Sequence, residues 1–153
     1  MMKKLFSVAL VMILLIGLLP CKTLAASELK NVEVIRYDDG GYLEISVEMN
    51  SARVANTVSG SKKYTYYDGN GDVRWEAKLS ATFAYSGGWY TCTTANCNVT
   101  IYDNQWYVIS NTTTRSSNNA VTNLTMGRRL LGVTVEKPQY RITLSCDING
   151  NLS

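Results

Sequence analysis

The strongest constraint on the fold is an unbroken alternation of apolar and polar side chains from Asp72 to Tyr85. The apolar positions are Val73, Trp75, Ala77, Leu79, Ala81, Phe83 and Tyr85. A period of two places these side chains on one face of a β-strand and the intervening ones on the other. At ~3.3 Å per residue the run spans about 40 Å, enough for one strand to extend along a whole β-sandwich. We therefore predict one long strand, with Trp75 and Phe83 in the core.

Two further stretches, 43–49 and 140–146, repeat the alternation, and turn-forming residues separate the candidate strands. Asp38–Gly41, Asp68–Gly71 and Asn149–Gly150 contain residues that tolerate positive φ, which favours antiparallel hairpins. Further candidate strands are Val32–Tyr37, Tyr64–Tyr67, Trp89–Thr93, Asn98–Tyr102, Trp106–Ser110, Ala120–Met126 and Leu131–Glu136. The sequence therefore predicts an all-β protein, an antiparallel, immunoglobulin-like β-sandwich.

Two polar stretches are predicted to be irregular. Residues 50–63, rich in Ser, Asn, Ala and Val, are expected to link an N-terminal hairpin to the main pair of sheets. Residues 111–119, rich in Thr and Ser, are expected to form a long solvated hairpin loop. The predicted organisation is a signal peptide at 1–25, an N-terminal hairpin and linking segment at 26–63, and a β-sandwich core domain at 64–153.

The N-terminus has the three parts of a secretory signal peptide. Lys3 and Lys4 form a positive start, an apolar run follows from Leu5 to Leu19, and small residues precede a cleavage position after Ala25. Cleavage would remove three of the 15 Lys and Arg residues and leave 12, equal to the 12 Asp and Glu residues. We predict a secreted, extracellular protein. Its neutral balance argues against a general electrostatic attraction to nucleic acid or anionic lipid, and the rest of the sequence holds no apolar run that would give a stable membrane anchor.

Three cysteines remain after cleavage, and export makes one disulfide plausible. A Cys92–Cys97 bridge would close a four-residue loop and suit a tight hairpin. A Cys92–Cys146 bridge would close about 55 residues, worth roughly 4 kcal/mol against roughly 2 for the short loop. Because Cys146 is in phase with the apolar positions 142 and 144, we favour Cys92–Cys146. Cys97 is then free, in a monomer, or joins a disulfide-linked dimer.

The chain contains no histidine, which excludes Ser-His-Asp and Cys-His nucleophile systems and His-ligated zinc hydrolysis within one chain. Three cysteines are too few for a tetrahedral zinc site, and we expect neither a metal nor another cofactor. Glu44 and Glu48 share a strand face but lie ~13 Å apart, wider than a glycosidase pair, so they are interpreted as solvated charges. Asp68–Asp72 resembles the start of a calcium loop, but Val73 stands where that loop needs glycine, which favours a hairpin turn.

Aromatic residues are the best candidates for ligand binding, because sugar rings stack on flat apolar faces. Consecutive aromatics at 64–67 and 106–107 must place rings on both sides of their strands. We therefore predict that Tyr64, Tyr66 and Trp106 are exposed and bind a ligand. The alternative is that they pack as ordinary cross-strand pairs. Arg128–Arg129, between two glycines, is interpreted as a solvated turn or strand crossing.

Several short motifs in the second half of the chain resemble a known family. They are Tyr66-Tyr67-Asp68-Gly69-Asn70-Gly71 with Trp75, Thr82-Phe83-Ala84-Tyr85-Ser86-Gly87 with Cys92, Val99-Thr100-Ile101-Tyr102 with Trp106, Leu131-Gly132-Val133, Leu144-Ser145-Cys146 and Asn149-Gly150-Asn151-Leu152-Ser153. Together they are similar to a family of small secreted proteins of Gram-positive gut bacteria, a domain of unknown function. The resemblance covers 64–153 and implies bacterial export, an all-β domain and pairing of Cys92 with Cys146. It implies no catalytic residue.

The leading hypothesis is a secreted, non-enzymatic binding module for an extracellular protein, a glycan or another cell-surface ligand. The second hypothesis is an antagonistic or membrane-active bacterial protein, against which the neutral charge and the lack of a basic amphipathic helix count. The third is a hydrolase that uses carboxylates.

Overall fold

The computed structural model describes residues 28–50 and 56–153, so the predicted signal peptide lies outside the described residues. The strands of the described part are β1 (Glu28–Arg36), β2 (Tyr42–Met49), β3 (Thr57–Tyr67), β4 (Val73–Ser86), β5 (Trp89–Ile101), β6 (Trp106–Ser116), β7 (Asn119–Leu130), β8 (Val133–Glu136) and β9 (Gln139–Ser145). Among these residues, no helix has the length and apolar character needed to cross a membrane.

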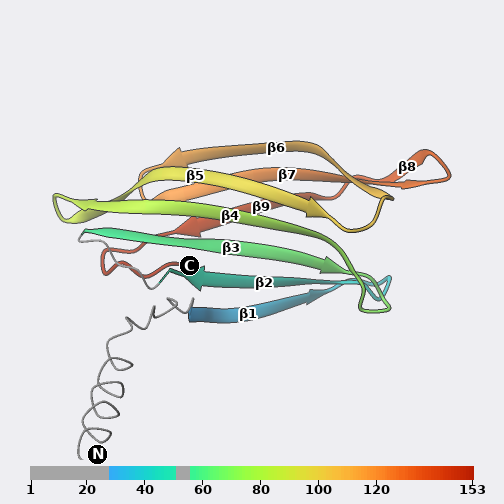
Figure 1. The fold of residues 1–153 in the computed structure, drawn as a ribbon, viewed down its shortest axis with the longest axis horizontal. Helices are drawn as coiled ribbons and strands as arrows, with labels where there is room; N and C mark the ends of the chain where they lie inside the picture. The colour runs from blue at the N-terminus through green and yellow to red at the C-terminus, as the bar shows by residue number, and fades with distance from the viewer. Residues whose placement is uncertain (1–27, 51–55) are drawn as a thin grey trace, which may run out of the picture.

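The strands form two antiparallel sheets that pack face to face, which confirms the predicted β-sandwich (Figure 1). One sheet has the order β1-β2-β3-β4-β5. In the other, β6 pairs along one edge of β7, and β8 and β9 follow one another along its opposite edge. The protein thus shares the two packed antiparallel sheets of immunoglobulin-like folds. Hairpins join β1 to β5 in order in one sheet and β6 to β8 in the other, where β9 pairs with β7.

The alternating runs supply the inner faces of the two sheets, as the sequence predicts. Trp75 and Phe83 of β4 are completely buried. The rest of the buried apolar core comprises Leu43, Ile45, Val47, Met49, Val58, Tyr66, Ala77, Leu79, Ala81, Cys92, Cys97, Trp106, Ala120, Leu124, Met126, Ile142, Leu144, Cys146 and Leu152. Because this core includes β2 and β3 as well as the later strands, both halves of the chain contribute to one hydrophobic interior.

The predicted linking segment at 50–63 is wrong for its second half, because β3 already begins at Thr57. This strand lacks a clear alternation of apolar and polar residues, because serines lie on its outer face and a glycine interrupts the apolar pattern of its inner face. Gly60 sits on that inner face, where a Cβ would lie 2.4 Å from the Leu152 side chain and 2.4 Å from the Glu48 carbonyl. Glycine is therefore required for Leu152 to pack into the core beside β3.

The predicted loop at 111–119 is also wrong. β6 continues to Ser116, and β7 begins at Asn119 after a two-residue turn. Threonine is polar but β-branched, so a threonine-rich stretch can be both solvated and extended. Thr113 contributes directly to the pairing, because its hydroxyl lies 2.8 Å from the hydroxyl of buried Thr122 on β7.

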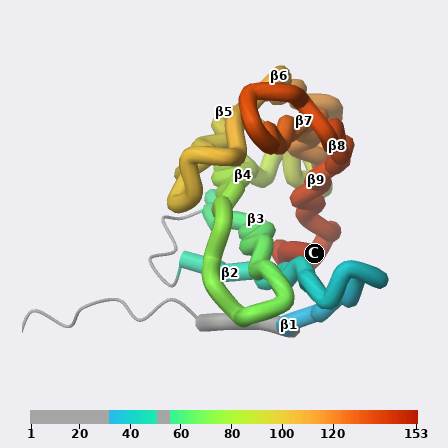
Figure 2. The backbone as a smooth tube through the Cα atoms, turned by 90° about the vertical axis from the view of Figure 1, so that its right-hand side faces the viewer, coloured from blue at the N-terminus to red at the C-terminus, as the bar shows by residue number. Residues whose placement is uncertain are grey.

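Alternate hairpin turns lie at the same end of the sandwich. The β1–β2, β3–β4, β5–β6 and β7–β8 connections all face the viewer in Figure 2. Two of them touch, because a Cβ at Gly40 would lie 3.6 Å from the Gly69 Cα. We call this end the turn-cluster end, and it carries the candidate site.

Candidate functional site

The structure buries two of the three aromatics that the sequence predicts to be exposed. Tyr66 is 6% exposed and Trp106 is 5% exposed, so the expectation of open rings is wrong for both. Tyr66 is in phase with Trp75, its cross-strand partner on β4, and therefore faces the core. Tyr64 is half-buried, with its ring edge-on to that of Tyr140 at 6.5 Å. Tyr67 takes the outer face and stacks on Tyr42 at 4.6 Å.

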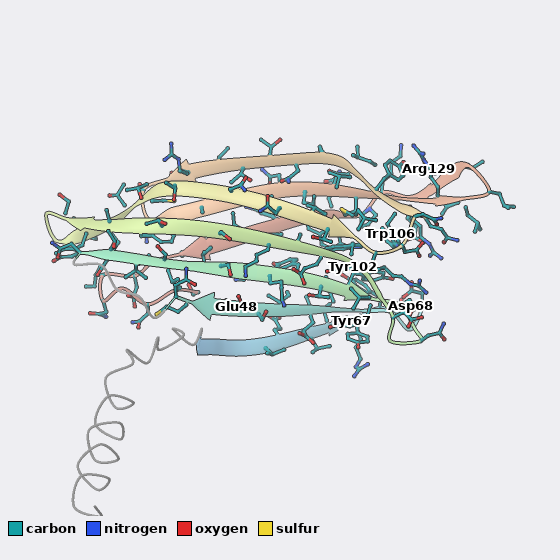
Figure 3. All side chains as sticks on the ribbon, viewed as in Figure 1. Glu48, Tyr67, Asp68, Tyr102, Trp106 and Arg129 are labelled. Atoms are coloured by element: carbon teal, nitrogen blue, oxygen red, sulfur yellow. The ribbon has the colours of Figure 1, made fainter. Side chains whose placement is uncertain are left out.

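Tyr66 and Trp106 nevertheless border a cavity of about 450 Å³ at the turn-cluster end. Its polar lining consists of Asp39, Asp68, Arg74, Asp103, Gln105 and Arg128. We call this cavity the polar cleft. Figure 3 shows Asp68 and Trp106 at this end, whereas Glu48 lies toward the opposite end of the sheet. Neither Asp39 nor Asp103 is among the ligand-binding residues that the sequence predicts.

Three aspartates reach the polar cleft from three different turns, and each uses its Oδ1 atom to fix its own turn. Asp39 Oδ1 accepts a hydrogen bond from the Gly41 N–H at 3.0 Å. Asp103 Oδ1 accepts one from the Gln105 N–H at 2.9 Å. Asp68 Oδ1 accepts from the N–H groups two and four residues later, at 3.0 and 2.9 Å. These contacts are Asx turns, and they leave each Oδ2 atom for interactions across the cleft.

Arg74 holds two of these turns together. Its guanidinium pairs with Asp68 and lies 3.3 Å from Asp103 Oδ2 and 3.7 Å from Asp72 Oδ2. Its carbonyl also accepts hydrogen bonds from the N–H groups of Tyr102 and Asp103. The hydrogen bond from Arg74 lowers the pKa of Asp68 below its usual value, so Asp68 is ionised at neutral pH. The predicted hairpin turn at 68–71 is confirmed, and its carboxylate is already occupied by N–H and guanidinium donors.

The rings of Tyr66 and Trp106 form an aromatic border for the cleft. Their centroids lie 5.2 Å apart, and Tyr66 stacks on Trp75 beneath it at 5.8 Å. Burial raises the pKa of Tyr66 to about 12, and the nearby Asp39 carboxylate adds to this shift, so its hydroxyl stays protonated as a donor. The hydroxyl donates to Asp39 Oδ2 at 3.5 Å, a long contact that leaves this carboxylate oxygen available to a ligand.

Arg128 adds a second guanidinium. Its Nη1 pairs with Glu136 Oε1 at 2.9 Å, and the guanidinium lies 6.0 Å from the Trp106 ring. Its Nε is buried and has no hydrogen-bond partner in the described part of the chain. A smaller cavity of about 140 Å³, lined in part by Tyr37 and Glu136, also borders Asp39, Tyr66 and Trp106. The two rings therefore border both cavities.

The described residues contain no group of three or more Cys, Asp or Glu side chains arranged to hold a metal ion. Glu48, one of the two candidate strand-face carboxylates, instead pairs with Lys78 at 2.9 Å, which lowers its pKa. Glu76 pairs with Lys63 at 3.7 Å. These carboxylates belong to ion pairs on the outer face of the five-stranded sheet, away from the polar cleft.

The three described cysteines are buried free thiols, and burial raises the pKa of each, that of Cys146 to about 11. Cys92 and Cys97 both lie on the continuous strand β5. Five residues of strand separate their Cα atoms by ~16 Å, beyond the ~7 Å limit for a disulfide. The tight hairpin that a Cys92–Cys97 bridge would need is therefore absent from the described chain, and pairing of Cys92 with Cys146 stays a prediction.

Comparisons of the chain with protein-family models, with curated proteins and with solved structures found no match.

Proposed function

We propose that the protein is an extracellular binding module that recognises a carbohydrate in the polar cleft. The supporting observation is the convergence of carboxylate acceptors, guanidinium and amide donors, and two aromatic rings around one cavity. Sugar hydroxyls both donate and accept hydrogen bonds, and charged partners make these bonds stronger. The C–H faces of a sugar pack against aromatic rings. Asp39 and Gln105 would act as an acceptor and a donor for hydroxyls, and only the small exposed parts of Trp106 and Tyr66 would contact the sugar at the apolar side.

The ion pairs that the cleft carboxylates form with Arg74 favour binding over hydrolysis. A glycosidase needs one carboxyl group that is protonated near neutral pH to act as general acid. Asp68 is held ionised by Arg74, which also lies against Asp103. The guanidinium thus neutralises two of the three cleft aspartates, Asp68 and Asp103, and leaves Asp39 without the second carboxylate of a glycosidase pair. We therefore propose a non-enzymatic role without a cofactor.

Export from a bacterial cell is part of this proposal. It is supported by the signal-peptide pattern at 1–25 and by the resemblance of 64–153 to secreted bacterial proteins. A Cys92–Cys146 bridge would suit such a compartment. The Cys92 N–H donates to the Ser117 carbonyl at 2.7 Å, and the Cys146 N–H donates to the Asn118 carbonyl at 3.0 Å. Cys92 on β5 and Cys146, directly after β9, therefore flank the same turn.

The test of carbohydrate binding is a glycan array, followed by calorimetric titration of the best-retained oligosaccharide. We expect Asp39→Asn to weaken binding by roughly tenfold or more, because a hydrogen bond to a charged acceptor is lost. Asparagine keeps an oxygen that can accept from the Gly41 N–H, so the turn is preserved.

Asp147→Asn is the matched control. Asp147 accepts the same kind of hydrogen bond from the N–H two residues later, that of Asn149, and a further one from the Asn151 N–H. It does not line the polar cleft. Its substitution should leave the affinity unchanged. Retention of no glycan, or equal affinity of the Asp39→Asn variant and the original protein, would contradict the proposal.

A further inference from the structure

We propose that the tip of the β7–β8 hairpin inserts reversibly into the surface of an anionic lipid bilayer. This activity goes beyond carbohydrate binding and uses different residues. In Figure 1 the hairpin projects past the neighbouring turns at the turn-cluster end. We call residues Leu130, Leu131, Val133 and Val135 the hairpin tip.

The hairpin tip exposes its four large aliphatic side chains to solvent. Leu131 is 98% exposed, Val133 is 65%, Val135 is 50% and Leu130 is 49%. Leu130 and Val133 are directly paired across the ladder, so they share one face of the hairpin. Single exposed apolar residues are ordinary, but four in one protruding hairpin mark an interaction site.

The backbone conformation at the tip is one that leucine rarely adopts. Leu131 has a φ of 50°, and Gly132 follows with a φ of 81°. Asparagine or glycine adopts this left-handed conformation more easily than leucine. Leucine at position 131 is thus unfavourable for two reasons, the strain of a positive φ and the exposure of an apolar side chain to water. Transfer of this side chain into lipid would remove the cost of its exposure to water.

Basic residues surround the base of the hairpin. Arg129 and Lys137 form no ion pair within the described residues, and Arg128 is paired with Glu136. The Arg129 guanidinium lies 4.2 Å from the centre of the Tyr107 ring, and the Tyr107 hydroxyl is 2.7 Å from that of Thr134. Figure 3 shows Arg129 set back from the end of the hairpin. An apolar tip with cations and a tyrosine behind it complements the layers of a membrane surface, hydrocarbon beneath anionic headgroups.

The charge arrangement selects the bilayer over an apolar protein groove. Two unpaired cations beside an aliphatic tip match a surface that is anionic over a wide area. Such attachment is peripheral and reversible, since four side chains cannot replace a membrane-spanning segment. It would hold the polar cleft close to the membrane, because both lie at the turn-cluster end.

The test is co-sedimentation of the protein with vesicles made of equimolar phosphatidylcholine and phosphatidylglycerol. We expect binding that falls with added salt and is weaker on phosphatidylcholine alone. Leu131→Asn should reduce the vesicle affinity by roughly tenfold, since a leucine side chain is no longer buried. Arg129→Gln should reduce it by roughly fivefold on anionic vesicles only.

Ile148→Asn is the matched control, because Ile148 is 61% exposed in the turn that follows β9. Asparagine suits the φ of residue 131, so the Leu131→Asn variant should fold and keep the circular dichroism of the original protein. Absence of vesicle binding, or equal losses in the Leu131 and Ile148 variants, would overturn the proposal. So would a dimer in solution that Leu131→Asn dissociates, because the tip would then serve self-association.

Discussion

Replacement of Trp75 by alanine is expected to lower the free energy of unfolding by about 3–5 kcal/mol, a large share of the total stability of a small domain. Trp75 is completely buried, and its ring lies 5.8 Å from Tyr66, 6.3 Å from Trp106 and 5.0 Å from Tyr140. Tyr66 comes from the same sheet, whereas the other two come from the opposite sheet. The substitution therefore removes the centre of the cluster that joins the sheets. Urea unfolding followed by fluorescence and circular dichroism measures the loss.

Tyr102→Ala provides the comparison, because Tyr102 is 59% exposed in the connection between β5 and β6. We expect its effect to stay within about 0.5 kcal/mol. Similar losses in the two variants would show that the ring cluster does not anchor the sheets to each other. The Trp75 variant should also bind carbohydrate less tightly, since Tyr66 loses the ring on which it rests.

The strands with strict alternation could be predicted from the sequence, because burial of one face is a local pattern. The run from Val73 to Tyr85 is found within β4, and the turn at 68–71 links β3 to β4 as expected. The pattern fails where an inner position is small or an outer position is apolar. Gly60 is such an inner position, and its role is set by Leu152. The pattern also fails in the threonine-rich part of β6, which is polar on both faces and is held in the sheet by pairing with β7.

The faces of adjacent aromatics could not be assigned from the sequence. Alternation requires that Tyr66 and Tyr67 point to opposite sides, and it does not say which side is buried. The structure decides this through the pairing of Tyr66 with Trp75. An aromatic pair within a strand therefore predicts one buried and one outer ring, and only the register of the neighbouring strand identifies them.

The polar cleft depends on strand parity. In a run of antiparallel hairpins, every second turn lies at the same end, so Asp39, Asp68 and Asp103 converge because their turns are the first, third and fifth connections. Each of these aspartates is followed by turn residues that are visible in the sequence. The sequence alone does not indicate this convergence, because an irregular linking segment at 50–63 leaves the path of the chain between the N-terminal hairpin and β4 undefined.

Oxidation of the protein is expected to join Cys92 to Cys146 and to raise the free energy of unfolding by roughly 4 kcal/mol, the value for closing a loop of this length. With oxidised glutathione as the oxidant, the two thiols lose two protons and two electrons, and the glutathione disulfide is reduced to two thiols. Both cysteines flank the turn at 117–118 and both are buried, so the bridge would link the two sheets inside the core. Urea unfolding with and without reductant measures the difference.

Alkylation before digestion, followed by non-reducing mass spectrometry, identifies the bridge. We expect a linked pair of peptides with Cys92 and Cys146, and an alkylated Cys97 after denaturation. Cys97→Ser is the matched control, since it removes a buried thiol from the same strand and should keep the dependence of stability on reductant. Cys92→Ser should abolish that dependence. Three alkylated cysteines in the oxidised protein would contradict the pairing, as would a dimer joined through Cys97 with the other two thiols free. In either case the two sheets would be held by the aromatic cluster and the aliphatic core alone.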